Sequence, residues 1–137
     1  MTTINAKKKE LVALVNGIYS VQTLEGKAFA LKASKNLNIL QDSLKDLEVA
    51  GKPSKEFMEL ANQVNVIAKE DTEDSKERIE VLETENEHLV TERQEQVEAL
   101  EVMMEQNLSV DLHLVTESEL PDNITTQQLS GITKIIK

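Results

Sequence analysis

Apolar residues recur at intervals of three and four along most of this chain, which is the spacing that places them on one face of an α-helix. The core they can build is almost entirely aliphatic, because the 137 residues include only two phenylalanines, one tyrosine and no tryptophan. All-β domains depend on aromatic and turn-forming residues, whereas packed helices use leucine, valine, isoleucine, alanine and methionine. The sequence therefore predicts a mainly α protein.

The first part of the chain, residues 5–51, predicts an antiparallel helical hairpin. Asn5 is placed to cap the first helix through its side chain, and Gly17 weakens the end of that helix. The second helix carries a stripe of alanine and leucine and ends at Gly51, where glycine suits the C-terminal cap. Pro53 then prevents continuation of the helix.

Residues 54–107 predict a long acidic helix. No apolar residue occurs in residues 70–78, so this helix either crosses solvent or breaks near Thr72. After the gap, residues 79–104 resume the helical spacing with polar positions and a one-residue phase shift, which is typical of a coiled-coil-like seam. We expect the seam to comprise Ile79, Leu82, Asn86, Leu89, Arg93, Val97, Leu100 and Met104.

Two interpretations of the seam stay open. The helix either packs along its own chain with its acidic face in solvent, or pairs with its copy in a second subunit. In the second case Asn86 sets the register and Arg93 pairs with a glutamate of the other subunit. We favour pairing, and hence a homo-oligomer, because a lone helix with so few apolar positions buries little surface.

Residues 109–137 predict a strand, a turn and a short helix that close the fold. Val110, Leu112 and Leu114 alternate with other residues at a strand's period of two. No other segment alternates clearly, so we expect this strand to pair with its symmetry mate or to lie extended over the helices. His113 would then lie on the polar face, exposed to solvent.

The final helix has a strong start signal. Thr125 and Gln128 have the spacing of a capping box, and Ile124 is placed to pack on Leu129 as a hydrophobic staple. This helix is too short to be stable alone in water, so it must dock on the rest of the protein. The whole chain, residues 1–137, is thus expected to form a single elongated helical domain.

Composition narrows the possible chemistry. The chain has no cysteine, so it has no disulfide, thiol nucleophile or Cys-ligated zinc, and His88 and His113 lack the spacing of a zinc motif. It also has no glycine-rich phosphate loop and no nucleophile motif. We therefore expect a protein that is not an enzyme and uses no cofactor or metal.

Location follows from two further features of the sequence. No apolar run approaches the ~20 residues that cross a bilayer. The N-terminus does not match a signal peptide, because its apolar part is short and lacks a small-residue cleavage site. We predict a cytoplasmic protein without a membrane partner.

The net charge of −10 is unevenly distributed. Residues 70–105 hold fourteen acidic and three basic residues, whereas residues 1–69 hold ten lysines and seven acidic residues. The acidic segment repels phosphates, so nucleic acid is not expected as a partner. The front of the chain offers candidate anion ligands, which are Lys8, Lys9, Lys27, Lys32, Lys35 and Asn36. These residues either flank a packing face in solvent or form an anion-binding pocket where subunits meet.

Three pieces of the chain, at its two ends, follow a shared pattern: "LVALVNGIY", "GKAFALKASKNLNIL" and "LSVDLHLVTESELPDNITTQQLSGITKII". They resemble an uncharacterised family of short tailed-bacteriophage proteins. That family begins with an "L…LN" helix, continues through a "K…SxKIAKNI" helix, and closes with "V.VDIH.IS…L…ISP..L.AL..II". The long Glu-rich middle departs from the family pattern, in which a shorter connection is expected.

The resemblance implies a small phage gene product made inside the bacterial cell. Two classes of function fit that setting. The first is counter-defence by binding, in which an oligomer sequesters a nucleotide-type host immune signal or blocks an immune effector protein. The second is a morphogenesis factor, such as a scaffolding protein or tail-assembly chaperone. The lysine-rich front favours a binding pocket and the acidic helix favours protein contacts, so we favour counter-defence over assembly.

Overall fold

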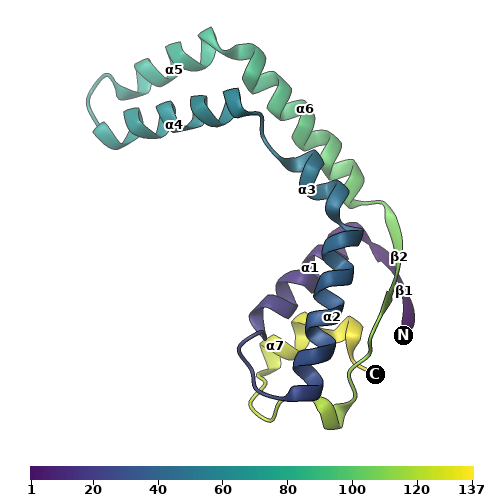
Figure 1. Cartoon of the computed structure of the whole chain (residues 1–137). Coiled ribbons are helices and arrows are strands. Elements are labelled where there is room, and N and C mark those ends of the chain that lie inside the picture. Colours follow the sequence, from purple (N-terminus) through teal and green to yellow (C-terminus); the bar gives the residue numbers. More distant parts are fainter. The chain divides into compact units, whose positions relative to one another are not determined.

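The computed structural model describes residues 1–137 and confirms a mainly helical protein with a two-stranded antiparallel sheet and a short C-terminal helix. The chain divides into two compact units (Figure 1). Met1–Leu47 and Val102–Lys137 form the first unit, and Glu48–Glu101 form what we call the acidic unit. The acidic unit is therefore inserted between the two halves of the first unit. None of the helices is both long enough and apolar enough to cross a membrane.

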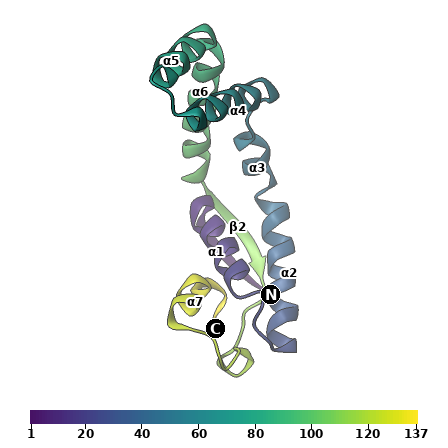
Figure 2. The ribbon, with the colours of Figure 1, turned by 90° about the vertical axis from the view of Figure 1, so that its left-hand side faces the viewer.

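The sheet of the first unit joins the two halves of that unit. Strand β1 (Thr2–Lys7) pairs with β2 (Asn107–Leu112), with Thr2 opposite Leu112 and Lys7 opposite Asn107. The expectation that the strand pairs with a symmetry mate or only lies over the helices was wrong. Its partner is the N-terminal segment of the same chain, labelled β1 beside β2 in Figure 1. Figure 2 marks the N-terminus near the end of β2, as the pairing of Thr2 with Leu112 requires.

The predicted helix start at Asn5 was also wrong. Thr2, Thr3 and Ile4 are β-branched residues that favour an extended backbone. Asn5 lies within β1, and its side chain accepts a hydrogen bond from Ser109 across the sheet rather than capping a helix.

Helices α1 (Lys8–Ser20) and α2 (Lys27–Ser43) each contribute three buried apolar side chains to the first unit's core. The start of α1 is held by the Lys7 backbone N–H, which donates to the Glu10 carboxylate at 3.1 Å. The second helix ends earlier than predicted, and a separate helix, α3 (Lys45–Gly51), follows it. Leu40, Leu44 and Leu47 stay buried across this break. Because the break leaves the apolar stripe intact, periodicity did not reveal it.

The C-terminal segment closes the first unit, as expected. It comprises the 3₁₀ turn η1 (Glu117–Glu119), helix α7 (Thr126–Gly131) and the 3₁₀ turn η2 (Thr133–Ile135). The capping box is present, since the Thr125 hydroxyl accepts from the Gln128 N–H at 3.1 Å and the Thr125 N–H donates back at 3.0 Å. Ile132 and Ile135 have no accessible surface, so this end of the chain is docked.

Helices α1 and α7 approach each other closely at Gly17. A Cβ atom added to Gly17 would lie 2.1 Å from the carbonyl oxygen of Gly131, which is shorter than any tolerated contact. Gly17 does not end its helix, because α1 continues to Ser20. Its small size instead allows the two helix backbones to meet.

The acidic unit contains α4 (Lys55–Glu70), α5 (Ser75–Glu85) and most of α6 (Glu87–Met104). Of the two alternatives left open by the sequence, a helix that crosses solvent or one that breaks near Thr72, the structure shows the break. Asp71 ends α4 in the left-handed region with φ of 46°. The buried Ser75 hydroxyl then accepts the Thr72 N–H at 2.9 Å and donates to the Ile67 carbonyl at 3.1 Å. These bonds turn the chain so that α5 lies alongside α4 (Figure 1).

Candidate functional site

The two lysines predicted on the first helical turn both make contacts within the first unit. Lys8 is buried, and its ammonium group lies 2.8 Å from the Asp46 carboxylate and 3.2 Å from the Gln106 side-chain oxygen. Lys9 lies 2.6 Å from the Glu105 carboxylate, whose other oxygen pairs with Lys7 at 2.9 Å. Hydrogen bonds from Lys9 and Lys7 lower the pKa of Glu105 to about 2. These cations therefore help to fasten β1 and α1 to the segment before β2.

Asn36 and Lys32 hold the chain that follows β2. Asn36 has no accessible surface, and its amide donates to the His113 carbonyl at 2.8 Å while accepting the His113 N–H at 2.7 Å. Lys32 donates to the Leu114 carbonyl at 2.9 Å and to the Glu119 carboxylate at 2.7 Å. The Asn36 side chain thus bonds both backbone groups of His113, as a residue of a neighbouring β-strand would.

Lys27 and Lys35 are exposed on α2 and make no salt bridge. The six predicted anion ligands therefore fall into separate groups within this chain. Lys8 and Lys9 contact residues 46, 105 and 106, whereas Lys32 and Asn36 contact residues 113–119. An anion pocket built where subunits meet stays a prediction, but it would have to compete with these internal contacts.

The Glu119 contacts predict an acid-sensitive component of stability. Hydrogen bonds from Lys32 and from Thr116 lower the pKa of Glu119 from 4.5 to about 2. The unfolded chain therefore binds more protons than the folded chain between about pH 4.5 and pH 2, so this contribution is complete above that window and is lost as the pH falls through it. At pH 7 we expect Glu119→Gln to unfold at a lower urea concentration than the wild type, with the difference disappearing near pH 2.

Equilibrium urea unfolding at a series of pH values measures this effect. Glu117→Gln is a suitable control, because Glu117 is exposed in the same turn and makes no salt bridge. A difference between Glu119→Gln and the wild type that persists unchanged to pH 2 would contradict this account.

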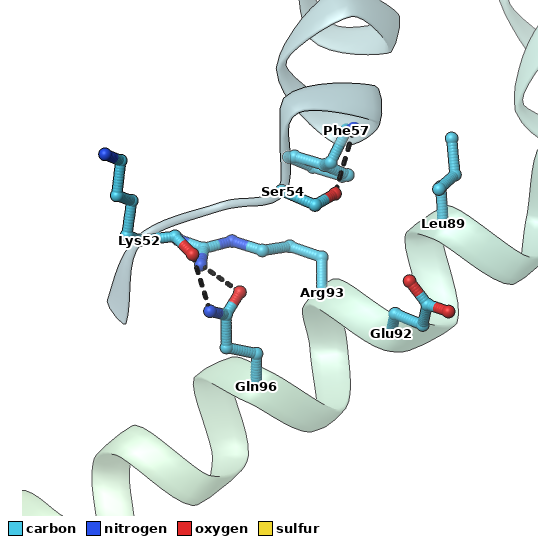
Figure 3. A pocket seen from close by; sticks show the side chains of 7 residues that line it. All are labelled: Lys52, Ser54, Phe57, Leu89, Glu92, Arg93 and Gln96. Carbon is cyan, nitrogen blue, oxygen red and sulfur yellow. Dashed lines mark hydrogen bonds between the residues drawn. The ribbon is translucent and has the colours of Figure 1, made fainter. Parts of the chain in front are cut away.

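A pocket of about 360 Å³ lies in the acidic unit where the chain passes from α3 to α4 (Figure 3). It is lined by Lys52, Ser54, Phe57, Leu89, Glu92, Arg93 and Gln96. The Arg93 guanidinium donates to the Gly51 carbonyl at 2.9 Å and to the Gln96 side-chain oxygen at 2.7 Å. Gln96 in turn donates to the carbonyls of Ala50 at 2.8 Å and Lys52 at 2.7 Å.

This arrangement satisfies the backbone of a helix end. The last carbonyls of an α-helix have no partner within the helix and carry partial negative charge, which a cation stabilises. Arg93 also lies over the Phe57 ring, 5.9 Å from its centroid. The sequence interpretation gave Arg93 a glutamate partner in another subunit, but within the chain its contacts are Gly51, Gln96 and Phe57. The sequence did contain one signal for these contacts. A helix was predicted to end at Gly51, and the free carbonyls at a helix end need hydrogen-bond donors.

The predicted seam residues are divided between two helices. Ile79 and Leu82 belong to α5, and the remaining apolar members belong to α6. Asn86 interrupts the helix between them and donates to the Leu82 carbonyl at 2.9 Å. All eight seam residues are half-buried, and α5, which carries Ile79 and Leu82, lies against α4 of the same chain. Packing along the chain's own helices therefore occurs for α5, and pairing with a second copy stays a prediction.

The two units differ sharply in charge. The acidic unit holds sixteen acidic and six basic residues, whereas the first unit holds nine of each. The whole net charge of −10 therefore belongs to the acidic unit. Its core is thin, since Leu60 is its only buried apolar residue. Val49, Met58, Val66 and Val81 all expose about half or more of their surface.

The acidic unit thus combines carboxylates with half-exposed apolar side chains, a combination suited to contacts with a basic surface. No group of three or more histidine, cysteine, aspartate or glutamate side chains is placed to hold a metal ion. We treat the acidic unit as the candidate functional site. No family model, no curated protein and no solved structure matches this chain.

Proposed function

We propose that this protein is a non-enzymatic phage accessory protein that acts by binding another protein, and that it counters host defence by occupying an effector of the host cell. The observation that carries the proposal is the separation of charge between the two units. A net charge of −10 on a unit of 54 residues creates a field that attracts a basic partner and accelerates encounter with it.

The thin core of the acidic unit supports the same proposal. Helices that keep their apolar residues half-exposed gain further stability when a partner covers those residues. The bacteriophage setting rests on the resemblance of the two chain ends to the phage family. Cytoplasmic location and homo-oligomer formation stay predictions alongside it.

Sequestration of a nucleotide-type signal has less support than binding of an effector protein. A phosphate-bearing ligand requires several cations that point at one place. Lys8, Lys9 and Lys32 are each paired with a carboxylate of the same chain. Only Lys27 and Lys35 of the predicted cluster are free of such partners, and both are exposed on one helix.

An infection experiment tests the proposal. The wild-type protein, carrying an affinity tag, is expected to restore plaque formation in defended cells and to capture a basic host protein identified by mass spectrometry. Replacing four exposed acids of the acidic unit by lysine should abolish both effects by reversing the local field. The four are Glu80, Glu83, Glu98 and Glu101.

Lys27→Glu combined with Lys35→Glu is the control, because it changes exposed charges of the first unit only. Circular dichroism must show that both variants keep the helical content of the wild type. Loss of activity in the lysine control, with activity retained in the acid variant, would overturn the proposal in favour of anion binding. Capture of capsid or tail proteins in place of a host protein would favour a morphogenesis factor.

A further inference from the structure

A groove of about 460 Å³ lies between the end of α4 and one face of α5, inside the acidic unit. It is lined by Ile67, Asp74, Glu77, Arg78, Val81, Leu82 and Glu85. Three of these residues are apolar, and Val81 exposes 52% of its surface. The groove therefore includes apolar surface that is exposed to solvent in the isolated chain.

Carboxylates dominate the charge of this groove. Asp74, Glu77 and Glu85 contribute three negative charges, against the single positive charge of Arg78. Arg78 is already paired with the Glu70 carboxylate at 2.7 Å. The Thr72 hydroxyl donates to the Asp74 carboxylate at 2.5 Å, and this hydrogen bond lowers the pKa of Asp74.

We propose that this groove is the docking site for a lysine- or arginine-bearing helical segment of the partner protein. Long basic side chains match the groove because their aliphatic stems cover apolar surface while their charged heads reach carboxylates. Here the stems would lie on Ile67, Val81 and Leu82, and the heads would meet Glu77 and Glu85. The proposal rests on the proposed function and specifies where and by what chemistry the partner binds.

Charge complementarity identifies the occupant. A second copy would bring another acidic unit with a net charge of −10 against this one, which opposes association through the groove. A basic amphipathic helix brings opposite charge and an apolar face together. Its binding should weaken as salt is added, because the charges at the groove are exposed.

A synthetic amphipathic helical peptide of leucine and lysine is the probe. Its affinity for the full-length protein is measured by fluorescence anisotropy, and its position by methyl NMR of the isoleucine, leucine and valine side chains. We expect the largest chemical-shift changes at Ile67, Val81 and Leu82. Replacing Glu77 and Glu85 together by glutamine should weaken binding about tenfold, because two exposed charge pairs are lost.

The matched control is Glu95→Gln combined with Glu98→Gln, which removes the same charge from exposed positions on α6 outside the groove. We expect this control to weaken binding by less than about threefold. Equal losses in the two double variants, or shift changes centred on α6, would overturn the groove assignment.

The peptide measurement separates failure of the groove from failure of the proposed function. If the wild-type protein restores plaque formation but the probe binds outside the groove, only the groove assignment is refuted. A groove that binds the probe as expected supports the docking site even when plaque formation is not restored, in which case only the counter-defence function fails.

Discussion

Replacing Gly17 by alanine is expected to destabilise the first unit by about 2–3 kcal/mol. Alanine normally stabilises a helix interior relative to glycine by roughly 0.5–1 kcal/mol. Here the steric cost exceeds that gain, because the new Cβ would lie 2.1 Å from the Gly131 carbonyl oxygen. The obstructing atom belongs to the backbone of α7, so no side-chain rotation relieves the clash. The two helices must move apart, and Ile132 and Ile135 lose part of their packing.

Tyr19 gives a direct readout of this change. It is the only tyrosine, the chain has no tryptophan, and its hydroxyl accepts a hydrogen bond from Gln41 at 2.7 Å. Tyrosine fluorescence during urea unfolding therefore follows the first unit. Asn16→Ala is the control, because Asn16 is exposed and adjacent in α1, and it should change the unfolding free energy by less than about 0.5 kcal/mol. A Gly17→Ala protein as stable as the wild type would show that α7 does not pack against α1 at this point.

Replacing Asn36 by leucine is expected to cost about 3–4 kcal/mol, although leucine has a similar volume and is more apolar. The substitution removes both hydrogen bonds to His113 and leaves that residue's N–H and carbonyl without their partner. Each buried polar group left unsatisfied costs roughly 1–3 kcal/mol. The gain from burying extra carbon at a site with no accessible surface is smaller than that combined loss.

Asn36→Asp tests the two bonds separately. At neutral pH aspartate still accepts the His113 N–H, but its second oxygen faces the His113 carbonyl instead of donating to it. We therefore expect Asn36→Asp to be clearly less stable than the wild type at neutral pH, as measured by the same fluorescence, because it loses one bond and places an unpaired carboxylate at a site with no accessible surface. Asn38→Leu is the matched control on the exposed side of α2 and should have little effect. Equal stability of the leucine variants at positions 36 and 38 would refute the bridging role of Asn36.

The helices of this fold were the most predictable part, because their apolar spacing is a property of neighbouring residues in the sequence. The capping box at Thr125 was predicted for the same reason, since it depends on a few adjacent residues, and the apolar gap at residues 70–78 raised a break near Thr72 as one of two alternatives. Strand β1 was missed because its stability comes from β2, about 100 positions away. Asn5 looked like a helix cap only while that pairing was unknown.

The candidate site was less predictable than the fold. A count of charges located the acidic segment, but it did not reveal that the segment folds as its own unit with a thin core. The lysines were predicted to gather round an anion. Sequence patterns show which residues share a helix face, whereas the ion pairs of Lys8 and Lys32 depend on chain segments 38 and 87 positions away. Contacts between residues so far apart in the sequence can be identified only from the three-dimensional structure.

The pairing of β1 with β2 has a consequence for synthesis on the ribosome. Lys7 lies opposite Asn107, so β1 has no partner until about 100 further residues have been made. At roughly 5–20 residues per second, the first strand waits at least about five seconds before the sheet can close. During that time α4 and α5 can form their hairpin from nearby contacts, which fold faster than distant ones. We therefore expect the inserted acidic hairpin to fold first, and the unit that carries both chain ends to fold last.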